Sequence, residues 1–467
     1  MRYLYIIIFM SAFSTVDAQN TSIKEVLGFD EYLGFVKKFH PIVKQAELVI
    51  DESQAKLLKS RGAFDPKIEV DYDRKKFKSL EYFDKLNATF KVPTWYGIEL
   101  KANFEENTGV FLNPEADVPE GGLYSAGFSF SAARGLLINE RMAALKQAKL
   151  FKEQAKADRD IYVNNILFEA SVVYFEWLKA YKENQVFENF LVNAEQRFLG
   201  VKRGVEVGER AAIDSIEARI AVNDRKLNFE KTRVKLIKAS LKLSNYLWLD
   251  DNTPLELQDN IIPNVNSERI IDDTFNTSAL RENEFSVDQH PKLLSLDYKK
   301  QNLNLERRLK ANKLLPKIDL EYNFLSETPR VSRSFSTSEY KAGVNISYPL
   351  FLRKERGDLK LAKLKIKDVD YEINATRIKI SNKVTATQKE LDSYVIQNGV
   401  MSQMITDYTQ MLRAEERKFQ LGESSLFLVN SRESKLIDGQ LKAIELQKKY
   451  YTTKAKLFNS LAVNPEL

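Results

Sequence analysis

The residue types that most often carry chemistry are scarce in this sequence. It has two histidines and no cysteine, which leaves few ligands for zinc or another transition metal. Both histidines, His40 and His290, stand directly before a proline, and proline suits the first turn of a helix. The placement therefore favours a helix start over a metal ligand.

Catalytic motifs are missing as well. The sequence contains no HExxH, P-loop, GxGxxG or GxSxG pattern. Neighbouring acids such as Asp272 and Asp273 lie in a polar stretch rather than in a recognisable catalytic motif. We expect a protein with no enzymatic activity, no bound metal and no cofactor, so any energy that it uses would have to come from a partner.

The amino terminus has the pattern of a secretory signal peptide, which we expect over 1–18. Arg2 precedes an apolar run over 4–13, and Val16 and Ala18 follow at the cleavage positions. A membrane anchor is the alternative, but the run is too short to span about 30 Å of hydrocarbon as a helix. No later stretch approaches about 20 consecutive apolar residues, so entry into a membrane would require a closed β-barrel.

Charge is balanced along the chain. The formal net charge is +6, from 71 basic and 65 acidic residues, and the two signs are interspersed. This pattern indicates solvated helix faces rather than a patch for nucleic acid.

The chain is a tandem repeat. Three segments of the first half recur in the second: 40–41 as 290–291, 66–72 as 316–322, and 124–131 as 340–347. The first two recur at an offset of 250 and the third at 216, so the first half carries about 34 extra residues between its strands (250 − 216). We expect repeats over 19–249 and 290–467, joined by a polar connecting segment over 250–289 with little regular structure.

Four predicted strands alternate between apolar and polar residues, as porin-type strands do. They are 66–74, 123–131, 316–325 and 339–348. A soluble sheet with one wet face would show the same alternation. Four strands cannot close a barrel, because the smallest known spanning barrels have about eight; a barrel would therefore need strands from several chains. A further alternating hairpin, at about 85–106, either joins the barrel or stands above the membrane.

Very long helices follow the strands in each repeat. The predicted helices are 138–199 and 210–247 in the first repeat, and 352–420 and 424–462 in the second. At 1.5 Å per residue the third would be about 100 Å long. Its apolar seam advances in alternating steps of three and four, the coiled-coil period: Leu359, Ala362, Ile366, Val369, Ile373, Thr376 and Ile380.

With these features the chain resembles the TolC family of outer-membrane efflux proteins over nearly all of its mature length. The resemblance rests on the duplicated plan and on two helix turns, 207–209 and 421–423, the first with Asp214 six residues after its glycine. It implies an α+β membrane protein: a trimer whose protomers pool four or more strands each into one outer-membrane β-barrel, 12-stranded in the known form. A long antiparallel coiled-coil tunnel would continue this barrel through the periplasm.

The function implied is the channel component of a tripartite efflux or type I secretion system. Substrates would pass through it passively from an inner-membrane pump and a periplasmic adaptor to the exterior. The implied partners are two further copies of the chain, the adaptor, the pump and outer-membrane lipid, with no nucleic acid. The cargo, whether drug, metal or protein, is not specified by the sequence.

The resemblance also assigns roles at the helix turns. Val207, Gly208, Leu421 and Gly422 would contact the adaptor, and the tunnel-entrance candidates are Asp214, Glu217, Phe427, Leu428 and Ser431. The best-known members carry aspartates six and nine residues after the second turn glycine, where this chain has Leu428 and Ser431. At the position of Ser424, those members carry a basic residue that forms part of a salt bridge closing the tunnel entrance. Phe427 and Leu428 suggest a hydrophobic constriction instead, which could gate by dewetting.

Two other classes of protein remain as alternatives. A periplasmic coiled-coil scaffold or adaptor without a membrane barrel would leave membranes without detergent. A hydrolase with a helical stalk would need a clustered catalytic set, which the sequence does not display.

Overall fold

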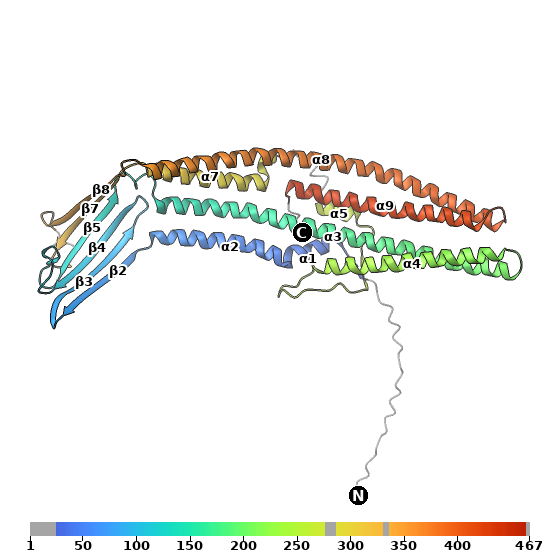
Figure 1. Cartoon of the computed structure of the whole chain (residues 1–467), viewed down its shortest axis with the longest axis horizontal. Helices are drawn as coiled ribbons and strands as arrows, with labels where there is room; N and C mark the ends of the chain where they lie inside the picture. Colours follow the sequence, from blue (N-terminus) through green and yellow to red (C-terminus); the bar gives the residue numbers. More distant parts are fainter. Residues whose placement is uncertain (1–24, 276–285, 330–335, 464–467) are drawn as a thin grey trace, which may run out of the picture.

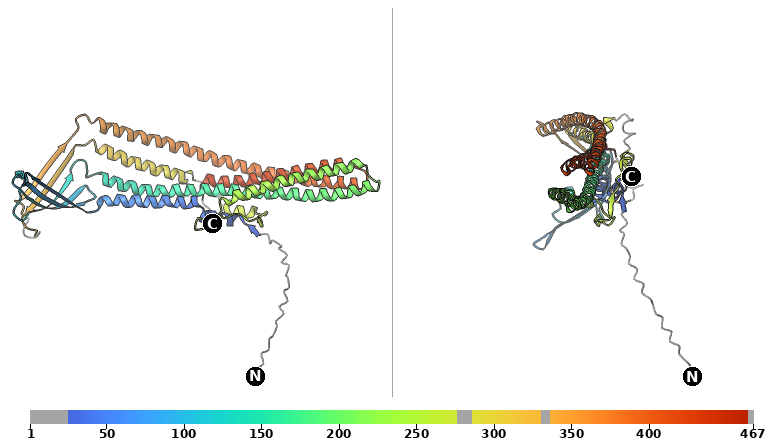
Figure 2. Two further views of the ribbon diagram at one scale, coloured as in Figure 1. Left: turned by 60° about the horizontal axis from the view of Figure 1, so that its bottom comes forward. Right: turned by 90° about the vertical axis from the view of Figure 1, so that its right-hand side faces the viewer.

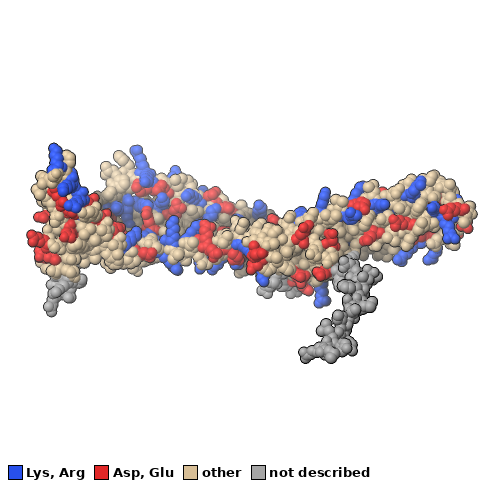
Figure 3. All heavy atoms as spheres, turned by 90° about the horizontal axis from the view of Figure 1, so that it is seen from below, with Lys and Arg blue, Asp and Glu red and all other residues tan. Residues whose placement is uncertain are grey.

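A long rod of helices carries a β-sheet at one end (Figure 1). The computed structural model describes residues 25–275, 286–329 and 336–463. The expected signal peptide, 1–18, lies outside the described residues. Basic and acidic side chains are interspersed along the visible face of the rod (Figure 3).

The two repeats fold into matching series of elements. The first comprises α2 (Pro41–Arg61), β2 (Lys67–Phe77), β3 (Leu80–Pro93), β4 (Ile98–Thr108), β5 (Leu123–Ser131), α3 (Glu140–Glu206) and α4 (Ala212–Ser244). The second comprises α7 (Pro291–Asn312), β7 (Lys317–Ser326), β8 (Tyr340–Ser347), α8 (Arg353–Gln420) and α9 (Leu426–Leu461). The longest helices, α3 and α8, have nearly equal lengths of 67 and 68 residues. The strands β3 and β4 of the first repeat have no counterpart in the second.

The sheet has six strands in the order β2-β3-β4-β5-β7-β8, and all neighbours are antiparallel. The extra hairpin therefore belongs to the sheet, and β3 begins at Leu80, before the predicted 85–106. One row of paired residues shows that the apolar face is continuous: Ile68, Phe90, Ala102, Ala126, Phe324 and Tyr340. The opposite face is polar across the same strands.

The first long helix does not end near residue 199, as predicted, but runs to Glu206. The glycines at 200 and 204 lie within this helix. A chain reversal needs a residue with positive φ, and the first one after α3 is Gly208, at φ +80°. Sequence alone does not distinguish a helical glycine from one that ends a helix.

The hydrophobic core lies near the middle of the rod, where α1 (Phe29–Phe39) and α5 (Glu268–Phe275) cover α3 and α9. Phe29 stacks on Phe175 at 5.1 Å between ring centroids, and Phe275 packs on Phe458 at 5.0 Å. Such aromatic contacts add to the stabilisation from buried area.

The expectation of little regular structure over 250–289 is wrong for much of this segment. It contains β6 (Ile261–Pro263), which pairs in parallel with β1 (Glu25–Leu27), and α5, whose Ile271 and Phe275 are buried. The predicted seam of α8 is confirmed, since Ala362, Val369 and Ile380 are buried and the remaining members are half-buried. Among the described residues, none of the helices combines the length and apolar character that crossing a membrane requires.

Candidate functional site: the helical tip

Two equivalent turns close the end of the rod opposite the sheet (Figure 1). Gly208 and Gly422 have φ of +80° and +79°. The Glu209 amide donates to the Gly204 carbonyl at 2.8 Å, and the Glu423 amide donates to the Lys418 carbonyl at 2.9 Å. Both bonds span five residues, as in a Schellman motif. The repeat therefore reproduces the same helix reversal twice.

The residues beside these glycines point into solvent. Val207 is 61% exposed and Leu421 is 69% exposed. A Cβ added at Gly208 or Gly422 would meet nothing within 4 Å, so the two turns are open at their outer surface. An exposed apolar side chain therefore lies beside the glycine of each turn.

The tunnel-entrance candidates flank these turns. Asp214 lies in the first turn of α4, where a carboxylate interacts favourably with the helix dipole. Glu217 accepts a hydrogen bond from Asn430 Nδ2 at 3.1 Å, so it is joined to the second hairpin beside Ser431. Phe427 is 67% exposed and Leu428 is 39% exposed, and both lie in the first turn of α9.

A polar cluster supports the second turn from inside. The Ser424 hydroxyl donates to Glu415, a bond that lowers the pKa of this carboxyl group. Arg432 lies 3.6 Å from the same carboxylate. The Arg210 guanidinium of the first turn stacks on the Phe419 ring of α8 at 4.0 Å, a cation–π contact. Sequence reasoning missed Arg210, because its partner lies in the other repeat.

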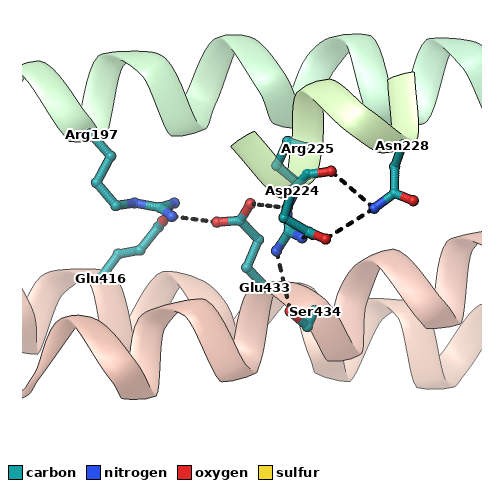
Figure 4. Close-up of polar contacts among 7 residues, drawn as sticks. All are labelled: Arg197, Asp224, Arg225, Asn228, Glu416, Glu433 and Ser434. Atoms are coloured by element: carbon teal, nitrogen blue, oxygen red, sulfur yellow. Dashed lines mark hydrogen bonds and ion pairs between the residues drawn. The ribbon is translucent and has the colours of Figure 1, made fainter. Parts of the chain in front are cut away.

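A buried charge network binds the two helical hairpins together above the tip (Figure 4). Glu433 of α9 is 1% exposed and receives hydrogen bonds from Arg197 of α3 and Arg225 of α4, the latter at 3.4 Å. Arg197 also reaches Glu416 of α8 at 3.1 Å, and Arg225 donates to the Ser434 hydroxyl at 3.2 Å. Sequence reasoning missed this network too.

Both histidines are helix N-caps, so the helix-start interpretation is confirmed. His40 Nδ1 accepts from the Ile42 amide at 3.2 Å, and His290 Nδ1 accepts from the Lys292 amide at 3.0 Å. A capping acceptor must be unprotonated. Among the described residues, no group of three or more acidic or imidazole side chains is placed to hold a metal ion.

Replacing His290 by asparagine is expected to reduce the acid sensitivity of the fold. Burial, aided by Lys383, lowers the pKa of His290 from 6.5 to about 4. Between these values the unfolded chain binds a proton that the folded chain excludes, so stability is complete above pH 6.5 and falls as the pH drops towards 4. Asparagine keeps the cap without titrating.

Thermal unfolding at a series of pH values would check this expectation. The variant and the wild type should unfold at similar temperatures at pH 8 and diverge below pH 6.5. His40→Asn is the matched change in the first repeat, where burial also lowers the pKa. Parallel pH dependences of wild type and His290→Asn would contradict the assignment.

Comparisons with known proteins agree with this architecture. Residues 287–463 match the family model described as "Outer membrane efflux protein". The sequence matches no curated protein.

Among solved structures, the CmeC outer membrane channel of Campylobacter jejuni is similar with a TM-score of 0.63 at 12% identity, over 93% of this chain and 85% of that one. VceC of Vibrio cholerae gives a TM-score of 0.64 at 11% identity, over 93% and 96% of the two chains. The MtrE channel of Neisseria gonorrhoeae gives 0.63 at 12% identity, over 99% and 97%.

Proposed function

We propose that the chain, whose residues 287–463 match the outer membrane efflux protein family model, is the outer-membrane channel component of a tripartite efflux or type I secretion system. The family and the fold are those of channel proteins rather than enzymes. The protein is located in the outer membrane, and its helices extend into the periplasm as a tunnel. Substrates pass through it passively from an inner-membrane pump and a periplasmic adaptor.

One observation carries the proposal: a single chain leaves a complete coiled-coil seam uncovered. The apolar residues of α4 that form this seam, here the α4 seam, are each at least 45% exposed: Ile213, Ile216, Ile220, Leu227, Val234, Ile237 and Leu241. They are spaced 3, 4, 7, 7, 3 and 4 residues apart, which is the heptad pattern of a seam that packs against another helix.

The partner for the α4 seam is another copy of the chain. α4 and α8 lie at opposite edges of the tip half of the rod (Figure 1), and the helices form an arc when viewed along the rod (Figure 2). In this half α8 also exposes Ile396, Val400 and Met404. Contact between α4 of one copy and α8 of the next is heterologous, and such contacts form a ring when the rotation between copies closes. We propose a ring of three.

The first experiment is extraction of the outer-membrane fraction with detergent, followed by light scattering to obtain the mass of the complex. A trimer that requires detergent supports the channel. A water-soluble monomer or dimer would overturn it and favour the periplasmic scaffold.

The adaptor docks on the two turns at the tip. Changing both Val207 and Leu421 to aspartate is expected to abolish co-purification with the adaptor and efflux, because charged groups replace the apolar contacts. Thermal stability should be unchanged, because both side chains are exposed. Leu58→Asp, at a residue of α2 that is 70% exposed, is the control, and equal loss of docking in this control would contradict a specific site.

Phe427 and Leu428 form a hydrophobic constriction at the tunnel entrance. Leu428→Asp is expected to raise conductance and cation selectivity in planar bilayers, because a carboxylate hydrates a dewetted constriction and attracts cations. Ser431→Ala, three residues further along α9, serves as the control. Unchanged cation selectivity in Leu428→Asp would show that Leu428 does not form the constriction.

A further inference from the structure

The inserted hairpin is an integral part of the sheet. β3 pairs with β2 over Lys67–Phe77 and with β4 over Glu99–Thr108 without leaving the sheet. Its apolar residues occupy the same face as those of the four repeat-related strands, as the row from Ile68 to Tyr340 shows. A hairpin standing clear of the membrane would not need this match.

The two edges of the sheet are complementary. All residues of β2 and of β8 are exposed, unlike those of the strands between them. Because six antiparallel strands alternate in direction, β2 and β8 run in opposite directions. The β8 edge of one copy can therefore pair in antiparallel fashion with the β2 edge of the next, which also satisfies the open backbone groups. These edges lie on the same sides of the protomer as α8 and α4 (Figure 1).

The polar face carries an uneven distribution of charge. One row of paired positions across all six strands, here the lysine row, reads Lys67, Lys91, Lys101, Gly127, Asn323 and Lys341. Lys91 pairs with Glu69, and Lys101 lies 3.3 Å from Glu321. The row therefore places four lysines, two of them paired with glutamates of neighbouring rows, on the face that a closed ring would turn inward.

The loop 109–122, which links β4 to β5, folds back over this polar face. Gly109 and Gly122 have φ of +141° and +91°, and a Cβ at Gly122 would lie 2.3 Å from the Phe104 ring. Asn107 Nδ2 donates to the Ala116 carbonyl at 2.8 Å, and the Phe111 ring packs on Tyr82 at 4.8 Å. Gly122 thus lies close to Phe104 of the apolar face, and the bond from Asn107 holds the middle of the loop over the polar face.

A hollow of about 620 Å³ lies between this loop and the polar face of the sheet. It is separate from a hollow of about 830 Å³ between the helices. The loop contributes Glu115 and Asp117 to the lining of the smaller hollow, and the lysine row contributes Lys91, Lys101 and Lys341. Acids of the loop and lysines of the sheet therefore share one space, which Glu105 and Glu321 of the sheet also line. Attraction between the loop acids and the lysines favours the folded-back position.

We propose, on the basis of the channel function above, that three copies close a ring of 18 strands and that loop 109–122 narrows its interior over the lysine row. Barrel diameter grows roughly in proportion to strand number, so this ring would have about twice the cross-section of one with 12 strands. A ring of this width leaves an aqueous channel. The same insert that widens the ring supplies the loop that obstructs it.

Electron cryo-microscopy of the detergent-extracted complex tests the strand count. A trimeric ring of 18 strands, with β8 of each copy beside β2 of the next, is the expected result. A trimer with 12 strands would overturn this inference and leave the channel function intact. A water-soluble particle without a ring would overturn both.

Thiol labelling on intact cells tests the loop, because the chain has no cysteine of its own. Ser125 lines the hollow, so Ser125→Cys should react with a small maleimide added outside but slowly with a bulky polyethylene-glycol maleimide. Glu115→Lys with Asp117→Lys replaces attraction by repulsion and should accelerate the bulky reaction several-fold. Equal rates with and without these changes would contradict the obstruction.

Two controls make the labelling specific. Glu120→Lys makes the same kind of substitution once, at an exposed loop residue outside the lining of the hollow, and should leave the bulky reaction slow. Ala126→Cys lies on the apolar face and should resist both reagents, since lipid covers it. Rapid labelling of both Ser125→Cys and Ala126→Cys would mean that the polar face is not enclosed by a ring.

Discussion

Replacing Glu433 by leucine is expected to lower the free energy of unfolding by about 3–5 kcal/mol, the usual cost of removing one partner from a buried ion pair. The carboxylate is 1% exposed, and the side chains of Arg197 and Arg225 that bind it are 15% and 8% exposed. Without Glu433, the buried positive charge of Arg225 is no longer neutralised by this carboxylate. The four helices of the tip half would lose their central connection.

Denaturant unfolding of the detergent-extracted protein, followed by circular dichroism, would measure this loss. Glu416→Gln is the matched control on the same network, because Glu416 is 38% exposed and exposed pairs contribute about 0–1 kcal/mol. Replacing Glu433, Arg197 and Arg225 together by apolar residues of similar size should restore much of the stability. A loss no larger than that of Glu416→Gln would show that the network is not structurally important.

Leu227→Asp is expected to dissociate the trimer while leaving the protomer folded. Leu227 is at the centre of the α4 seam and 56% exposed in a single chain. Each contact between copies would lose about 1.5–3 kcal/mol of apolar burial and gain an unpaired carboxylate, which costs more. Light scattering should report monomers, and circular dichroism should report an unchanged helix content.

Lys226→Glu is the control for this experiment. It changes the charge of an exposed residue one position away, which is about 100° around the helix and off the seam. This variant should remain trimeric. A trimeric Leu227→Asp protein would mean that the α4 seam does not join the copies.

Local pattern in the sequence determined much of this protein. The alternation of the strands and the three-four spacing of α8 depend on residues that are near neighbours in one element, and the 250-residue offset between the histidine–proline pairs is read by comparing two short segments. Such periodicities report directly which face of an element is apolar. The helix-capping role of His40 and His290 followed from the adjacent proline alone.

Only the tertiary structure decided which elements meet. The hairpin of β3 and β4 alternates like a strand pair in any sheet, and the alternation does not say which strands it pairs with; in the structure it pairs with β2 and β5, and β5 joins the second repeat through β7. Glu433 finds Arg197 and Arg225 more than 200 residues away in sequence. No local period encodes such a contact, because burial of a charge is favourable only where distant helices bring its partners. The end of α3 was decided in the same way, by the backbone conformation of Gly208 rather than by the presence of a glycine.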